Sequence, residues 1–362
     1  MNIVSAQAPG RINLIGEHTD YNQGFAMPIA LEQRTTVRFE PDGSDRITLR
    51  SAEEGDGVSF SISAKPGDVD GWSAYPAGSV WALSEAGHPA VGGTMTVSSD
   101  VPIGAGLSSS AALECAVLLA MTTATGTELD RLELARIAQR GENDFVGAPT
   151  GLMDQLASMN GEVDRALLID FDDSSVRPVA FDLEAHDLAL LVFDSNAAHR
   201  HSTGEYALRR ESCTRAAHAL GVDSLRRVQG VDGVLSRIED EVDRRRVRHI
   251  LTENERVLAC AKAMSEGDFR TVGLLMSASQ ASMRMDFEIT TPHIDLIAES
   301  AVQHGAWGAR MTGGGFGGCV ISVVPANRVG HIGEAVTADV IAGGHPRPTV
   351  FTTTAGAGAS VV

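Results

Sequence analysis

Val101-Pro-Ile-Gly-Ala-Gly-Leu-Ser-Ser-Ser-Ala-Ala112 is the stretch on which the fold of this chain depends, and it runs directly into the apolar segment 113–121. That segment predicts a buried helix. Glycines let a backbone approach a ligand closely, and the unpaired N–H groups and dipole of a helix start favour a phosphate. The serine hydroxyls could add hydrogen bonds or a Mg²⁺ ligand. A sharp strand-to-helix turn explains the same pattern, so this stretch alone leaves both interpretations open.

The composition excludes several classes of protein. The chain has 362 residues, a length that suits two domains, and its 43% hydrophobic content is ordinary for a globular protein. A net charge of −18 argues against nucleic acid and anionic membranes as partners. The only lysines are Lys65 and Lys262, and neither follows a glycine loop. This excludes the Walker A loop and the lysine motif of protein kinases.

The cysteines and the N-terminal residues indicate a cytoplasmic protein. The four cysteines are scattered, without a Cys-x-x-Cys pair, so neither a disulfide framework nor a zinc site is indicated. The first ten residues lack a basic region followed by a hydrophobic run. Since no apolar stretch reaches membrane-spanning length, we expect no membrane partner.

A second polar motif, Arg11-Ile-Asn-Leu-Ile-Gly-Glu-His-Thr-Asp-Tyr-Asn22, lies near the N-terminus. Glu17, His18 and Asp20 crowd into four residues. Convergent acceptors and donors suit a polyol, whereas one histidine and two acids so close together cannot easily surround a metal ion. A solvated turn would explain Asp20, but it explains Glu17 and His18 poorly.

Two carboxylates further along the chain have more than one interpretation. Thr127-Glu-Leu-Asp130 predicts a capping box that starts a helix to about residue 145. Glu142 lies near the end of that helix, where the dipole disfavours a carboxylate, so it either faces water or has a cation. Asp154 lies in the first turn of a short helix after Gly151. It is either a stabilising N-terminal acid or a carboxylate beside a reacting hydroxyl, and the sequence leaves both open.

The remaining patterns predict an alternation of strands and helices in two halves. In the first half we expect strands at 2–8, 25–40, 46–51, 57–63 and 93–99, and a helix at 71–86. Trp72 and Tyr75 lie one turn apart in that helix, and periodicity alone favours core packing for them. Acidic, loop-rich residues place the domain boundary within 165–186, which gives domains of 1–185 and 186–362.

The second half begins with a buried strand at 188–193 and continues with helices near 205–220, 245–266, 268–283 and 292–304. Five glycines in the window 313–318 then precede an apolar strand at 319–324. Because so many glycines lose much backbone entropy on folding, we expect this loop to lie against a ligand or another loop. A helix at 327–343 and a strand at 348–354 complete the predictions.

Three motifs in order resemble those of the GHMP kinases and, within them, the galactokinase family. Gly10 to Phe25 is similar to the galactokinase signature, Val101 to Ala112 to the phosphate loop, and Ala309-Arg-Met-Thr-Gly-Gly-Gly-Phe-Gly-Gly-Cys319 to the third GHMP motif. The resemblance spans essentially the whole chain. It implies an α+β fold with a ribosomal-S5-like N-terminal domain, a ferredoxin-like C-terminal domain and an active site between them.

The resemblance also implies roles for individual residues. Asp154 matches the catalytic aspartate and Arg11 its partner. The positions that match the sugar site are Glu17, His18, Asp20, Gly151, Asp154 and Tyr206. Trp72 and Tyr75 match residues beside the adenine, which replaces the core-packing interpretation, and the phosphate positions are Gly104, Ala105, Gly106, Leu107, Ser108, Ser109 and Ser110. Ser110 and Glu142 would bind Mg²⁺. Gln23 and the loop 197–203 depart from the family pattern.

The implied activity is phosphorylation of the anomeric hydroxyl of α-D-galactose by ATP, the first committed step of galactose utilisation, in a cytoplasmic monomer. Three alternatives stay open. Kinases of N-acetylgalactosamine or another sugar share these motifs. A non-catalytic sensor of galactose and ATP would lack a Ser-Ala pair in the phosphate loop, and Ser110-Ala111 is present here. A two-domain binding protein would leave the matches at Asp154 and Arg11 as coincidence.

Overall fold

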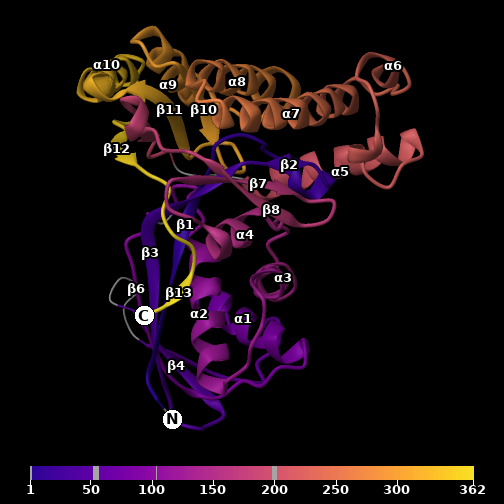
Figure 1. Ribbon diagram of the computed structural model, residues 1–362. Helices are drawn as coiled ribbons and strands as arrows, with labels where there is room; N and C mark the ends of the chain where they lie inside the picture. Colours follow the sequence, from indigo (N-terminus) through magenta and orange to yellow (C-terminus); the bar gives the residue numbers. More distant parts are fainter. Residues whose placement is uncertain (1, 52–56, 103, 198–201) are drawn as a thin grey trace.

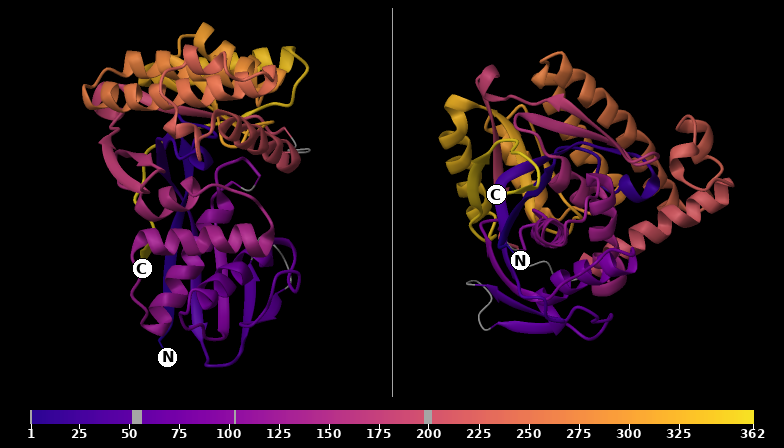
Figure 2. Two further views of the ribbon diagram at one scale, coloured as in Figure 1. Left: turned by 90° about the vertical axis from the view of Figure 1, so that its right-hand side faces the viewer. Right: turned by 60° about the horizontal axis from the view of Figure 1, so that its bottom comes forward.

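The structure is a computed structural model that describes residues 2–51, 57–102, 104–197 and 202–362. Residues 198–201, the centre of the polar loop named above, lie outside the described residues. Two parts are stacked along the long axis of the molecule, and each contains a sheet with its own helices (Figures 1 and 2). The α+β fold class is therefore confirmed.

The lower part in Figure 1 is built on a six-stranded sheet with the order β13-β1-β3-β6-β4-β5. Its strands are β1 (Val4–Asn13), β3 (Pro28–Pro41), β4 (Arg46–Ser51), β5 (Val58–Ser61), β6 (Gly93–Ser99) and β13 (Ser360–Val361). Alternation explains β6, where Met95 and Val97 face the core and the neighbouring Thr94 and Thr96 do not. Since β13 pairs with β1, the chain ends in the sheet in which it begins.

Helices cover one face of this sheet (Figure 1). They are α1 (Ala74–Glu85), α2 (Ser109–Thr125), α3 (Arg131–Arg140) and α4 (Met153–Asn160). The predicted buried helix is α2, whose residues from Ala111 to Leu118 are all buried. The predicted capping box is wrong by three residues, because Asp130 is itself the N-cap and accepts the N–H of Glu133 at 2.7 Å. The helix then widens into a π-helical turn, η3 (Gly141–Val146).

The upper part contains a four-stranded antiparallel sheet with the order β10-β11-β9-β12. Its strands are β9 (Leu188–Asp194), β10 (Gly308–Thr312), β11 (Cys319–Pro325) and β12 (Thr349–Thr353). Alternate residues of β9 face different cores: Leu190 and Val192 pack in one, and Leu191 and Phe193 in the other. Burial of both faces explains why β9 is a continuous apolar run.

Long helices accompany this second sheet, and α7 to α10 lie above it in Figure 1. The helices of this part are α5 (Ser202–Leu220), α6 (Asp232–Leu235), α7 (Glu241–Ser265), α8 (Phe269–Ser282), α9 (Pro292–Gln303) and α10 (Val329–Ala342). A small third sheet, β2 (Phe25–Ala26), β7 (Arg165–Asp170) and β8 (Ser175–Ala180), lies between the two parts. One apolar core contains residues of β1, β7, β9 and α7, so it joins the parts.

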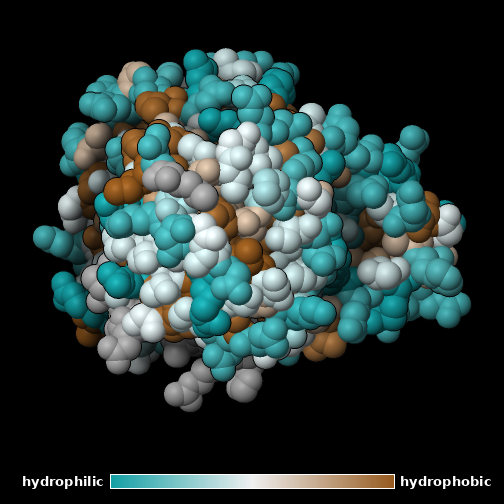
Figure 3. Space-filling model, turned by 90° about the horizontal axis from the view of Figure 1, so that it is seen from below, coloured by the Kyte–Doolittle hydropathy of each residue, from teal (hydrophilic) through white to brown (hydrophobic). Residues whose placement is uncertain are grey.

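On the face seen from below, hydrophobic residues form small separate patches among hydrophilic ones (Figure 3). The described residues of this face therefore form no large apolar contact area. Among the described residues, no helix combines the length and apolarity needed to cross a bilayer.

Candidate active site

A cavity of about 390 Å³ lies where three segments meet: the phosphate loop, the motif at 11–22 and the glycine-rich loop at 313–318. Its size is within the usual range of ligand sites. Most of the residues assigned by resemblance line it: Arg11, Glu17, His18, Asp20, Gly104, Gly106, Leu107, Ser108, Ser109, Ser110, Glu142, Gly151, Asp154 and Tyr206. The loop at 313–315 closes the cavity from the C-terminal part. These segments are far apart in the sequence, so the cavity exists only in the folded chain.

Arg11 and Asp154 form the most specific polar contact in this cavity. Arg11 donates from Nε to Oδ1 of Asp154 at 2.7 Å and from Nη2 to Oδ2 at 2.8 Å, a bidentate pair that fixes both planes. Its third nitrogen, Nη1, donates to the carbonyl of Gly106 at 2.7 Å. Ser108 also donates to Asp154 Oδ2. One arginine therefore ties the carboxylate to the phosphate loop.

The phosphate loop has the backbone that its glycines suggested. Gly104 and Gly106 have φ of 75° and 74°, in the left-handed region that favours glycine. Ser108 also has a positive φ, of 57°, and α2 begins at the next residue. The loop is held from behind, because Arg11 donates its main-chain N–H to Leu107 and Cys319 donates its thiol to the carbonyl of Ala105. Ala105 is buried and supports the loop without lining the cavity.

Glu142 lies beside the first turn of α2. It accepts from Ser110 Oγ at 3.0 Å, Thr150 Oγ1 at 2.9 Å and Gln155 Nε2 at 2.7 Å. Burial raises the pKa of Glu142, and the nearby Asp154 raises it further. No arginine, lysine or histidine of the described residues forms an ion pair with it. A buried carboxylate with only neutral donors is suited to a cation, as the sequence suggested.

The oxygen ligands at Glu142 and Ser110 suit Mg²⁺ better than a metal ion coordinated by protein side chains alone. Among the described residues, no group of three or more histidine, cysteine, aspartate or glutamate side chains could hold a metal. Mg²⁺ commonly takes one or two carboxylates, with substrate phosphates and water completing its shell. Ser110 and Glu142 lie next to a phosphate-binding backbone, which is where such a shared ion would bind.

His18 is held in one orientation by residues of both parts. Its Nε2 lies 3.1 Å from the carbonyl of Gly314, which can only accept, so this nitrogen carries the proton. Its Nδ1 then accepts from Tyr21 Oη at 2.8 Å. The ring also packs on Tyr206, with centroids 4.8 Å apart. Burial lowers the pKa of His18 to about 3, so the ring is neutral at physiological pH.

Asp20 and Gly151 lie in direct contact with each other in the lining of the cavity. Burial raises the pKa of Asp20 to about 6, even though the carboxylate accepts the N–H of Tyr21 at 2.9 Å. The charge of Asp154 contributes to the same rise. A Cβ atom at Gly151 would overlap the Asp20 carboxylate. Close approach therefore explains why glycine is needed at a position that the sequence singled out only by resemblance.

Glu17 has partners that the sequence interpretation missed. Its carboxylate pairs with Arg310 of β10 and accepts from Asn13 and from the N–H of Gly313. Two further side chains, His249 and Glu253 of α7, bind the main chain of the same motif. A lone arginine between Ala309 and Met311 in an apolar strand is the one signal that could have identified Arg310 in advance.

Trp72 and Tyr75 do not line the main cavity. Trp72 lines a second, separate cavity of about 560 Å³ beside β4 and β5. Both side chains are partly buried against the N-terminal core, as periodicity suggested. Burial raises the pKa of Tyr75, and the nearby Glu142 raises it further.

Three segments of the chain match known families. Residues 2–41 match the galactokinase galactose-binding signature, residues 74–162 the GHMP kinases N terminal domain and residues 260–342 the GHMP kinases C terminal domain. A galactokinase of Mycobacterium bovis is 58% identical over 358 residues, covering 99% of both chains. A galactokinase of Streptomyces coelicolor is 46% identical, covering 97% of this chain and 92% of its own.

Solved structures agree with these relatives. The crystal structure of Lactococcus lactis galactokinase complexed with galactose aligns with a TM-score of 0.94 and 31% identity, covering 99% of this chain and 95% of that one. A mevalonate kinase of Methanococcus jannaschii aligns with a TM-score of 0.70 and 17% identity over 97% of this chain and 98% of its own. At that identity the second match concerns the fold alone.

Proposed function

This chain belongs to the galactokinase family of GHMP kinases, and we propose from this premise that it transfers the γ-phosphoryl group of ATP to the anomeric hydroxyl of galactose. The products are galactose 1-phosphate and ADP. The observation that carries the proposal is the arrangement of one cavity. In it, Asp154 and Arg11 lie between the phosphate loop and the polar side chains at 17, 18 and 20. Phosphoryl transfer needs such alignment and charge neutralisation more than covalent help.

Asp154 receives the proton of the anomeric hydroxyl in the reaction we propose. Both of its oxygens are engaged by Arg11, and Ser108 donates to one of them, so the carboxylate cannot rotate away from the cavity. Its role combines orientation of the hydroxyl with acceptance of the proton as the bond to phosphorus forms. Arg11 places a positive charge beside the carboxylate and next to the phosphate loop.

The phosphates of ATP bind to the loop from Gly104 to Ser110 through its free main-chain N–H groups and the start of α2. Ser110 and Glu142 would hold Mg²⁺. When bound, the ion neutralises negative charge on the phosphates. Glu142 is already oriented for this task by Thr150 and Gln155.

Galactose binds among Glu17, His18, Asp20, Gly151 and Tyr206 in this proposal. The ring of Tyr206 packs on His18 and supports that side of the cavity. Gly151 leaves room for the Asp20 carboxylate, which is free to accept sugar hydroxyls on the oxygen that Tyr21 does not use. The bound sugar then lies between this group and Asp154.

Four further assignments are proposals of the same kind. Trp72 and Tyr75 flank the adenine. Residues 1–185 and 186–362 act as two domains, apart from β13 at the C-terminus, which returns to the sheet of the first domain. The protein acts as a monomer. It works in the cytoplasm, where its four cysteines, all free and buried, stay reduced.

The test is ADP release with a panel of sugars. Purified protein with ATP and Mg²⁺ is offered galactose, N-acetylgalactosamine, glucose, talose and mannose, and ADP is followed by a coupled assay. We expect galactose to give the highest kcat/KM and a product phosphorylated at the anomeric oxygen, identified by ³¹P NMR. Preference for N-acetylgalactosamine would change the substrate, and galactose binding without ADP release would indicate a sensor instead of an enzyme.

A further inference from the structure

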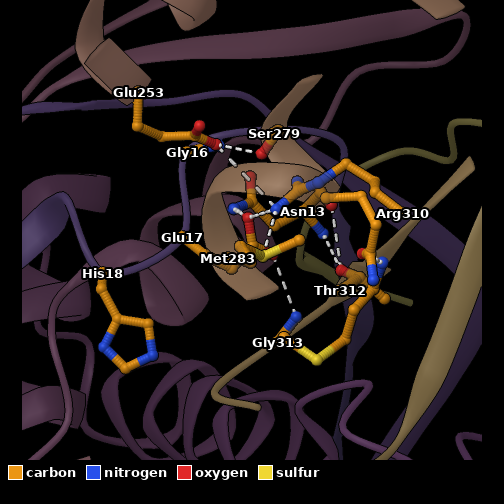
Figure 4. A network of polar contacts seen from close by, with 12 residues as sticks. Asn13, Gly16, Glu17, His18, Glu253, Ser279, Met283, Arg310, Thr312 and Gly313 are labelled. Carbon is orange, nitrogen blue, oxygen red and sulfur yellow. Dashed lines mark hydrogen bonds and ion pairs between the residues drawn. The ribbon is translucent and has the colours of Figure 1, made fainter. Parts of the chain in front are cut away.

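Arg310 is the largest side chain that is completely buried among the described residues. It lies in β10 between Ala309 and Met311, both of them buried in the C-terminal core. A guanidinium in such surroundings strongly destabilises a fold unless acceptors meet it. Its contacts all go through Nη2, to the Glu17 carboxylate, to Met283 Sδ at 3.2 Å and, at 4.0 Å, to the Glu253 carboxylate (Figure 4). Arg310 itself does not line the main cavity.

The Glu17 carboxylate is almost saturated by these contacts. Its Oε2 accepts from Arg310 Nη2 and from Asn13 Nδ2, the latter at 2.8 Å, and its Oε1 accepts from the N–H of Gly313 at 3.0 Å (Figure 4). An ionised carboxylate has about four acceptor positions. Three of them are filled by protein, so one remains, on Oε1. Glu17 lines the main cavity, so a ligand hydroxyl that reaches Glu17 from the cavity could donate to that position.

The main chain around Glu17 is fixed by the same part of the molecule. The ring Nε2 of His249 contacts the carbonyl of Glu17 at 3.2 Å, and Glu253 Oε1 accepts the N–H of Gly16 at 3.0 Å. Ser279 donates to that same oxygen of Glu253 at 2.6 Å. Although burial opposes ionisation, Arg256, His249 and Arg310 hold the pKa of Glu253 at about 2. Arg310 thus lies between the carboxylate that faces the cavity and the carboxylate that binds the loop.

We propose that Arg310 is a positioning residue for sugar selection: it holds Glu17 so that a single acceptor position on Oε1 faces the cavity. The site then distinguishes a sugar that has one particular hydroxyl from one that lacks it. A buried acceptor left without a donor is unfavourable, so an analogue without that hydroxyl is rejected. The proposal rests on the proposed function, and it adds that selection is controlled by a residue that never touches the sugar.

The test compares galactose with its four monodeoxy analogues at saturating ATP. For wild-type protein, kcat/KM should be at least tenfold lower for one analogue than for galactose, because that analogue lacks the hydroxyl that binds Glu17. Glu17→Gln should reduce this difference and leave the differences for the other analogues unchanged. Arg310→Met should weaken the same preference at least tenfold and raise the KM for galactose, with the KM for ATP unchanged. Arg310→Lys keeps the buried charge, but its shorter side chain ends short of the position of Nη2, the nitrogen that contacts Glu17, so it should fold and weaken the preference at least threefold.

A matched control separates positioning from general destabilisation. Arg215→Met also removes the arginine partner of a buried carboxylate, Asp243, whose Oδ1 lies 2.8 Å from Arg215 Nη2, but neither residue lines the main cavity. This variant should keep the wild-type kcat/KM of each analogue relative to galactose, whatever its melting temperature. The melting temperature of each variant is measured alongside, and Arg310→Lys decides the matter where Arg310→Met does not fold.

The outcomes for the two proposals are distinct. Wild-type protein that releases no ADP with galactose overturns the proposed function. An active wild type whose Arg310 variants lower kcat/KM for galactose and all analogues by one common factor overturns the positioning role alone. Unchanged rejection of the same analogue in Arg310→Lys and Arg310→Met also overturns it.

Discussion

Arg11 and Asp154 hold each other within the N-terminal part, whereas Glu17 and His18, a few residues further along the chain, also depend on partners in the C-terminal part. The first pair needs only β1, α4 and the phosphate loop. The second depends on Arg310 and on the main chain of Gly313 and Gly314. The difference indicates that the residues for phosphoryl transfer and the residues that select the sugar are positioned by different parts of the molecule. Substitutions in the C-terminal part should therefore affect sugar binding more than phosphoryl transfer.

The largest effect is expected at the chemical side, with Asp154→Asn. The amide keeps the shape of the side chain but cannot accept a proton, and general base catalysis is commonly worth about 10²–10⁴-fold. We expect kcat to fall by that range while galactose still binds, measured by single-turnover ADP release and by calorimetry. Asp144→Asn, an exposed acid outside the cavity, is the control. A kcat near the wild-type value in Asp154→Asn would show that the carboxylate only supports the fold.

A smaller effect is expected for Glu142→Gln. The substitution removes the charge that we assign to Mg²⁺ binding, while Ser110, Thr150 and Gln155 remain. The Mg²⁺ concentration for half-maximal activity should rise about 10- to 100-fold, and binding of Mn²⁺ with ADP, measured by electron paramagnetic resonance, should weaken in parallel. Glu133→Gln, at an exposed position of α3, should change neither quantity. An unaltered metal requirement in Glu142→Gln would remove this residue from the site.

Gly151→Ala tests the sugar side more mildly. The new methyl group overlaps the Asp20 carboxylate, which has to move. Crowding of this kind destabilises by roughly 1–3 kcal/mol, so the KM for galactose should rise about tenfold or more and the KM for ATP should stay the same. Gly204→Ala is the matched control, because a Cβ there meets no atom within 4 Å. Equal changes in both KM values would mean that Gly151 serves the whole cavity.

The smallest effect is expected from pH. The pKa values of Asp20 and Glu17 are raised by burial, to about 6 and about 7, so both carboxylates gain protons as pH falls from 8 to 5. A protonated carboxyl group accepts hydrogen bonds poorly, and kcat/KM for galactose should decline several-fold over this range. His18, with its pKa lowered to about 3 by burial, stays neutral throughout. In Asp20→Asn the part of the decline centred near pH 6 should disappear; a profile identical to wild type would exclude Asp20 as its origin.

Local patterns predicted most of the framework. The helix after the phosphate loop and the apolar strand β9 follow from periodicity, which depends on neighbouring residues, whereas the α+β class was implied by the resemblance to the GHMP kinases. The capping box at Thr127 failed because the helix begins three residues later, where Asp130 is placed to accept the N–H of Glu133. From the sequence, Glu142 was a carboxylate that either faces water or has a cation. The π-helical turn that aims it at Ser110 could not be foreseen, because it depends on packing against α1.

The sequence by itself determined the parts of the site whose properties are local: glycines with positive φ at 104 and 106, free N–H groups at the start of α2, and polar side chains clustered at 17–20. Only the tertiary structure decided which distant residues meet. Arg11 reaches Asp154 across 143 residues, and Arg310 reaches Glu17 across 293. A backbone conformation depends on neighbours in the chain. An ion pair between distant residues depends on how two sheets and their helices pack. The pairing of Arg310 with Glu17 is therefore a consequence of where β10 lies relative to the first motif, and the sequence did not predict it.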